Sequence, residues 1–154
     1  MENQLNNKLG DRPSMNIVAE LERRFLPHLQ RIAAKLQTEF PKFQITTWSS
    51  PTGSLTEYQG HDLGIDCVLP DAPPDQPYTI CLIIGVMHLT TSPEICDAEV
   101  SGGPGTPGTE LSLLDAPIPF SLEALEWIEA QLSRLVEVLR TALQRWHPLE
   151  LDSR

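Results

Sequence analysis

Apolar residues recur every three or four positions between Met15 and Phe40, which is the spacing of one face of an α-helix. The members of this stripe are Val18, Leu21, Phe25, Leu29, Ile32, Leu36 and Phe40. Ser14 is placed to cap the start of the helix, and Pro41 is expected to end it. Pro27 interrupts the stripe, but the apolar positions keep their phase across it. The pattern therefore predicts one continuous helix with a kink near Pro27.

A second stripe of the same period follows Ser121 and reaches Trp146. Its members are Leu122, Leu125, Ile128, Leu132, Leu135, Leu139, Leu143 and Trp146. Ser121 can cap this helix, and Glu123 and Glu126 lie near its N-terminal partial charge, where carboxylates are stabilising. Pro148 is expected to stop it. A second long amphipathic helix is predicted to end at about Trp146.

The chain between the two stripes shows the period-2 alternation of β-strands. Four strands are predicted at 43–50, 58–69, 78–91 and 94–100, with a short fifth at 111–114. The strand at 78–91 is apolar on both faces, so we expect it at the centre of the sheet with a cover on each side. If both helices cover one face, a homodimer packed sheet to sheet or a bound partner protein would cover the other.

These elements predict an α+β domain, in which an antiparallel sheet of four to five strands is flanked in sequence by two long amphipathic helices (α-β-β-β-β-α). A length of 154 residues with 40% apolar content is typical of a single globular domain. We assign this domain to residues 14–147, with a flexible leader at 1–13 and a C-terminal tail at 148–154. The chain shows no secretory signal and no apolar run of roughly 18 residues, so a cytoplasmic protein without a membrane partner is expected.

Charge is distributed unevenly along the chain, which carries a net charge of −10. Every Lys and Arg lies in 8–42 or 134–154, and none occurs from Phe43 to Ser133, the segment that contains the predicted sheet. An acidic sheet repels phosphate groups, so nucleic acid is not expected as a partner. It attracts basic polypeptides instead, although acidity that serves only solubility is the alternative. The strands also lack the Lys that often protects exposed sheet edges.

The leading hypothesis is a small non-enzymatic protein-binding module, chaperone-, adaptor- or immunity-like, that binds a basic protein partner through its acidic sheet region. The acids expected to contact this partner are Asp62, Asp66, Glu94, Asp97 and Glu99. Small bacterial secretion chaperones and toxin-immunity proteins share this size, acidity and mixture of helix and strand, which is an analogy of class that fixes no residue. No catalytic residue, metal-ligand set or cofactor is predicted.

The alternative hypothesis is a small enzyme or a ligand- or metal-binding domain with a site near His61, Asp62 and His88. Imidazole and carboxylate groups are suitable ligands for divalent metals. On a regular strand, however, Asp62 points to the face opposite His61, which weakens this interpretation.

Cysteine and glycine patterns add no chemistry. Cys67, Cys81 and Cys96 are odd in number and lack the close pairs of zinc sites, so reduced core thiols are expected. No nearby cation would activate one of them as a nucleophile. The segment 102–108 is rich in Gly and Pro but lacks the spacing and the lysine of a phosphate-binding loop, so it is predicted to be an irregular linker.

Overall fold

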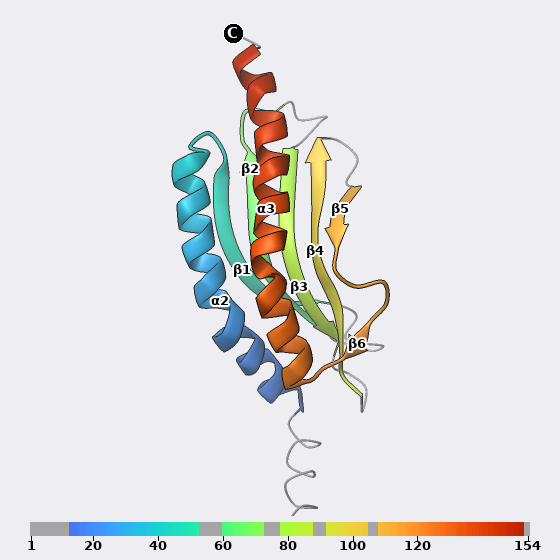
Figure 1. Cartoon of the computed structure of the whole chain (residues 1–154). Helices are drawn as coiled ribbons and strands as arrows, with labels where there is room; N and C mark the ends of the chain where they lie inside the picture. Colours follow the sequence, from blue (N-terminus) through green and yellow to red (C-terminus); the bar gives the residue numbers. More distant parts are fainter. Residues whose placement is uncertain (1–12, 53–59, 73–77, 88–91, 105–107, 153–154) are drawn as a thin grey trace, which may run out of the picture.

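The computed structural model describes residues 13–52, 60–72, 78–87, 92–104 and 108–152. Its elements are, in chain order, α2 (Pro13–Glu39), β1 (Gln44–Thr52), β2 (Gly60–Leu69), β3 (Tyr78–Met87), β4 (Glu94–Pro104), β5 (Gly108–Ser112), β6 (Ile118–Pro119) and α3 (Leu122–Asp152) (Figure 1). The predicted α+β class is confirmed, since an antiparallel sheet is flanked in sequence by two long helices. The predicted leader lies outside the described residues except for Pro13, as do residues 88–91 of the third predicted strand.

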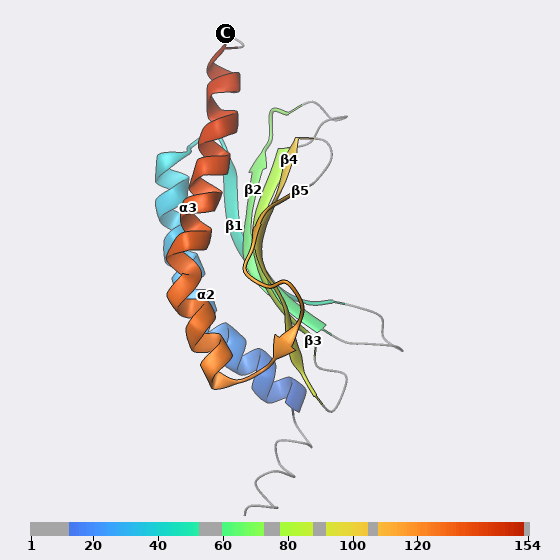
Figure 2. The same cartoon turned by 45° about the vertical axis from the view of Figure 1, so that its right-hand side comes forward.

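The strands form an antiparallel meander in the order β1-β2-β3-β4-β5, and β6 pairs with the first residues of β4. The apolar strand β3 is central, as predicted. Both helices lie on one face of the sheet, and the strands curve so that the opposite face is concave (Figure 2). One layer of helices and one layer of strands therefore enclose a single core.

Alternation along β2 shows how the core is built. Leu63, Ile65 and Cys67 are buried against the helices, while Asp62 and Asp66 are only partly buried on the other face. The helices bury their own stripes in the same layer, in which the fully buried side chains include Leu21, Phe25, Leu29, Leu82, Ile84 and Leu125. Burial of these apolar side chains is the main stabilising contribution to the fold.

Helix α2 passes through Pro27 without interruption, and Figure 2 shows that it bends along its length. The buried stripe continues on both sides of an exposed Pro27, from Leu21 to Leu36. Ser14 lies inside the helix, which is described from Pro13, so its predicted role as N-cap was wrong.

Helix α3 begins as predicted and ends later. The Ser121 hydroxyl accepts a hydrogen bond from the N–H of Ala124 at 3.0 Å, so Ser121 caps the helix. The helix then continues through Pro148 to Asp152, which corrects the predicted end at Trp146. The φ angle that proline imposes is close to that of a helix, so the ring can be accommodated where one backbone hydrogen bond is given up.

The segment predicted as a linker at 102–108 is partly strand. Gly102 and Gly103 belong to β4 and pair with Ile80 and Thr79. Gly102 has a φ of 127°, and a Cβ at this position would overlap with the carbonyl oxygen of Thr79. Glycine at residue 102 thus allows β4 to continue although its backbone passes very close to that of β3. Residues 105–107 lie outside the described residues.

Of the helices that the structure describes, none has the length and apolar character that crossing a membrane requires.

Candidate functional site

The face of the sheet that points away from α2 and α3, here called the open face, is the candidate site. No described helix or strand lies over it (Figure 2). Strand alternation and register assign to the open face the side chains of Thr46, Trp48, Ser50, Asp62, Asp66, Val68, Thr79, Cys81, Ile83, Met87, Glu94, Asp97, Glu99 and Ser101. A central strip of apolar side chains on β3 is therefore flanked by acids on β2 and β4.

Register brings the acids of the two flanking strands close together. Asp62 on β2 and Asp97 on β4 both lie opposite Gly85 of β3. A Cβ at residue 85 would overlap with Asp62 Oδ1 and would lie 3.0 Å from Asp97 Oδ2, so both carboxylates lean over this glycine. Glu99 lies one row further along β4, beside Ile83.

A β-bulge decides that Asp97 and Glu99 of β4 lie on the open face. The register changes between Gly85, which pairs with Asp97, and Val86, which pairs with Ile95. In a regular strand without this bulge, alternation would place Asp97 on the same face as the buried Ile95. The bulge switches the phase, so that Ala98 and Val100 face the core beyond it. Sequence periodicity could not reveal this change, because it depends on pairing with β3.

The structure places all five acids of the predicted partner-binding set, Asp62, Asp66, Glu94, Asp97 and Glu99, partly buried on the open face. Glu94 lies apart from the other acids of β4, near the end of the strand where β6 pairs with it. Asp66 accepts a hydrogen bond at 2.8 Å from Nε1 of Trp48, which holds the indole ring on this face.

Burial raises the pKa values of three carboxyl groups on the open face, and neighbouring acids add to the shift at Asp62 and Glu99. Burial, followed by the charges of Asp97 and Glu99, raises the pKa of Asp62 to about 6. Burial also raises the pKa values of Asp97 and Glu99, and the neighbouring charge of Asp97 contributes to the shift at Glu99. Among the described residues, no Lys or Arg forms an ion pair with any of these three carboxyl groups.

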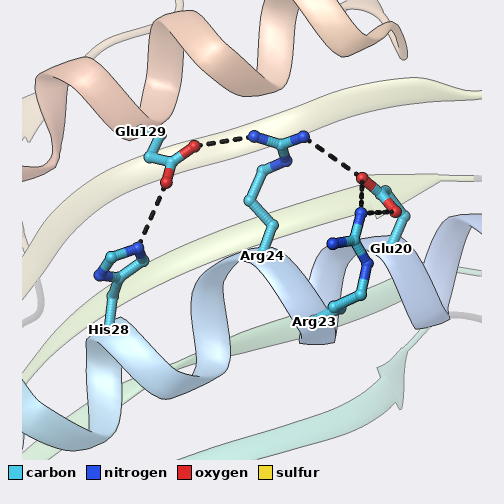
Figure 3. Close-up of polar contacts among 5 residues, drawn as sticks. All are labelled: Glu20, Arg23, Arg24, His28 and Glu129. Atoms are coloured by element: carbon cyan, nitrogen blue, oxygen red, sulfur yellow. Dashed lines mark hydrogen bonds and ion pairs between the residues drawn. The ribbon is translucent and has the colours of Figure 1, made fainter.

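The ion pairs that described Arg residues form lie elsewhere, mostly in the helix layer. Arg24 of α2 contacts Glu20 at 3.3 Å and Glu129 of α3 at 2.8 Å (Figure 3). His28 contacts the second oxygen of Glu129 at 3.2 Å, and Arg23 pairs with Glu20 at 2.6 Å. Further pairs join Arg140 to Glu39 and Glu137, and Arg145 to Glu110. The helix layer therefore carries both signs of charge, whereas the charged side chains assigned to the open face are all acidic.

The alternative site near His61, Asp62 and His88 is not assembled among the described residues. His61 is buried on the core face, Asp62 lies on the open face, and His88 lies outside the described residues. No group of three His, Cys, Asp or Glu side chains within the described ranges could hold a metal ion.

His61 instead joins a polar cluster that sequence reasoning missed. Its Nε2 lies 2.6 Å from Oγ of Ser49, which donates a hydrogen bond to Oε2 of Glu22 at 2.7 Å. In a nucleophilic triad the acid binds the second ring nitrogen of the histidine, whereas here Glu22 lies on the Nε2 side at 4.0 Å. The cluster joins α2, β1 and β2, and no spacing in the sequence indicates it.

The three thiols are free, but only Cys67 is a core residue. Cys81 is partly buried on the open face and Cys96 is partly buried at the bulge of β4, which corrects the expectation of three core thiols. Burial raises the pKa of Cys67 and of Cys81 to about 12, so neither is activated as a thiolate.

Comparison with known protein families, with curated proteins and with solved structures found no match for this chain. Its function can therefore be inferred only from the geometry and the charge of its own residues.

Proposed function

We propose that this protein is a non-enzymatic binding module whose open face binds a basic segment of another protein. The observation that carries the proposal is the group of carboxyl groups on Asp62, Asp97 and Glu99, which flank an apolar strip and form no ion pair with a described Lys or Arg. A chaperone-, adaptor- or immunity-like role in the cytoplasm is consistent with such a surface and belongs to the same proposal.

Asp62, Asp97 and Glu99 on the open face should attract cations, because their charged forms are destabilised when no cation is near. The raised pKa of Asp62 means that its charged form is destabilised by burial and by the neighbouring acids. An ammonium or guanidinium group placed among these carboxylates would remove part of that repulsion. Affinity would come from the basic residues together with apolar contacts to Ile83 and Met87.

Self-association through the open face is disfavoured by the same charges. Two copies packed sheet to sheet would bring their Asp62, Asp97 and Glu99 side chains together without a cation. Of the two alternatives for covering this face, the predicted homodimer is therefore less favoured than a bound partner protein. A light-scattering mass of one chain at micromolar concentration would exclude the homodimer. Among the residues that the structure describes, no group of side chains favours the alternative metal-binding function.

A labelled peptide tests the proposal directly. We would use a fluorescein-labelled 12-residue peptide in which Lys alternates with Val, and as its control the same peptide with Glu in place of Lys. Fluorescence anisotropy should show binding of the basic peptide alone. The affinity should fall as salt is raised from about 0.05 to 0.2 M, because salt screens charges over roughly 10 Å.

Two matched double variants separate the open face from the overall charge. Asp62→Asn with Asp66→Asn, on the strand of the open face next to β1, should weaken binding about tenfold, corresponding to about 1.4 kcal/mol. Glu123→Gln with Glu126→Gln removes the same charge from exposed positions of α3 and should change affinity less than twofold. Equal losses in the two variants would show that net charge alone attracts the peptide, and absence of binding would contradict the proposed function.

A further inference from the structure

Strand β1 forms one edge of the sheet, and among the described strands it pairs with β2 alone. It is nine residues long and carries no charged side chain, so no Lys blocks its extension. Ile45, Thr46, Thr47 and Trp48 also have the side chains that strands favour. The edge is thus able to accept another strand.

The side chain of Gln37 shows which backbone groups of β1 face outward. Its Oε1 accepts a hydrogen bond from the N–H of Ile45 at 3.0 Å, and its Nε2 donates to the carbonyl of Phe43 at 2.7 Å. These groups therefore point away from β2. Because orientation alternates along a strand, the N–H and C=O groups of Thr47 and Ser49 point the same way. Within the described ranges, no hydrogen bond reaches these four groups.

A groove runs beside this edge, between α2 and β1. Its volume is about 450 Å³, and its lining includes Ala33, Ala34, Gln37, Ile45 and Thr47. The two alanines leave the space open, since larger side chains at these positions of α2 would fill it. A strand added to β1 would direct every second side chain into this groove and the others onto the open face.

The residues of β1 on the open face give an added strand access to the acids. Thr46 lies directly opposite Asp66, and Ser50 lies directly opposite Asp62. An added strand would lie about 10 Å from β2, two strand spacings away, and a Lys or Arg side chain can extend over small neighbours across much of that distance. Between them, the Trp48 ring offers a surface for a cation.

We propose that the basic segment of the partner binds as an added β-strand, paired with Thr47 and Ser49 of β1, with its apolar side chains in the groove beside α2 and its basic side chains on the open face. This inference rests on the proposed function and specifies how the partner is recognised. The added strand lies nearest to Asp62 and Asp66 on β2, whereas Asp97 and Glu99 on β4 lie two strands further away and attract it through their charge without direct contact. A second copy of the chain is disfavoured as the occupant, because each copy carries a net charge of −10.

Amide hydrogen exchange, measured by NMR with the alternating Lys and Val peptide, tests the pairing. In the free protein the amides of Thr47 and Ser49 should exchange rapidly, and saturating peptide should slow them at least tenfold. The amides of Thr46 and Trp48 already point to β2, so their exchange should change little. Peptide binding without slower exchange at Thr47 and Ser49 would overturn strand addition while leaving the proposed function intact.

Two further peptides make the test independent of any variant of the protein. One carries N-methyl groups on all of its valines and the other on all of its lysines, so each lacks the hydrogen-bond donors along one of its edges. With valines directed into the groove, an antiparallel strand donates its valine N–H groups to β1, and a parallel strand donates its lysine N–H groups. One methylated peptide should therefore lose at least tenfold in affinity relative to the other. Equal affinities would overturn the inference.

Two variants of β1 test the same pairing from the side of the protein. Thr47→Pro removes one outward N–H and should weaken binding of the unmethylated peptide about tenfold, whereas Thr46→Ala on the same strand should leave the affinity within twofold. Circular dichroism would verify that both variants fold. Failure of every basic peptide to bind would contradict the proposed function and this inference together. A dimer that Thr47→Pro dissociates would assign the edge to a second copy and overturn the inference.

Discussion

Arg24 of α2 and Glu129 of α3 form an ion pair of 2.8 Å that joins the two helices across the outer layer of the molecule (Figure 3). Glu129 also contacts His28, so a single carboxylate holds two side chains of α2. Both partners are partly shielded from water, with 17% of the Arg24 side chain and 34% of the Glu129 side chain exposed. Such a pair contributes more to the free energy of unfolding than a fully exposed ion pair, which contributes about 0 to 1 kcal/mol.

Removal of this carboxylate should loosen the helix layer. Glu129→Gln is expected to lower the free energy of unfolding by about 1 kcal/mol and the melting temperature by about 2 to 4 °C. Glu126→Gln on the same helix is the control, because Glu126 is exposed and forms no ion pair with a described residue. Calorimetric melting at low and high salt checks the prediction, and identical melting of the two variants would contradict it.

The thiols should react slowly in the native protein. At pH 7.5, a pKa of about 12 leaves far less thiolate on Cys67 and Cys81 than on an ordinary cysteine, and burial restricts access as well. We expect reaction with a thiol reagent such as Ellman's reagent to be at least about 100-fold slower than in guanidinium chloride, with Cys67 the slowest. Rapid labelling of Cys67 in the folded protein would contradict its placement in the core.

Two glycines of the open face should respond differently to an added methyl group. A Cβ at residue 64 would overlap with the backbone carbonyl of Leu82, which cannot move without disturbing the pairing of β2 with β3. A Cβ at residue 85 meets the side-chain oxygens of Asp62 and Asp97, which can rotate away. Gly64→Ala should therefore cost about 1 to 3 kcal/mol and Gly85→Ala less, as measured by urea unfolding.

Much of this fold could be predicted from local patterns. The apolar stripes of α2 and α3 and the alternation of Leu63, Ile65 and Cys67 depend only on residues close in sequence, so periodicity reveals them. The end of α3 was predicted too early, because a proline signal such as Pro148 carries no information on what the surrounding structure tolerates.

Features that depend on pairing between distant segments were not predictable. The strand character of Gly102 follows from its approach to Thr79, and the bulge at Cys96 follows from register with β3. The acidity of the sheet could be read from the sequence, since no Lys or Arg occurs from Phe43 to Ser133. Which acids share a face could not be read from it, because the bulge decides the orientation of Asp97 and Glu99.

The carboxyl cluster should make stability depend on pH in an unusual direction. The pKa of Asp62 in the folded protein, about 6, lies above its ordinary value of 3.8, so the folded state binds the proton more tightly than the unfolded chain. Above pH 6 the folded state carries the unfavourable charge, and below about pH 4 the residue is protonated in both states. This group therefore adds stability as the pH falls from 7 to 4, whereas a salt-bridged carboxylate would remove it.

Asp62→Asn isolates this effect. At pH 7.5 the variant should be more stable than the original protein by roughly 1 kcal/mol, a value reduced for screening by water because Asp62 is only partly buried. At pH 4 the advantage should vanish, since a protonated Asp62 and an asparagine are both neutral. Asp71→Asn, at an exposed position after β2, should show no comparable change between the two pH values. Urea unfolding at both pH values measures these differences, and an advantage of Asp62→Asn that is the same at pH 4 and pH 7.5 would contradict the raised pKa that burial and the neighbouring acids give Asp62.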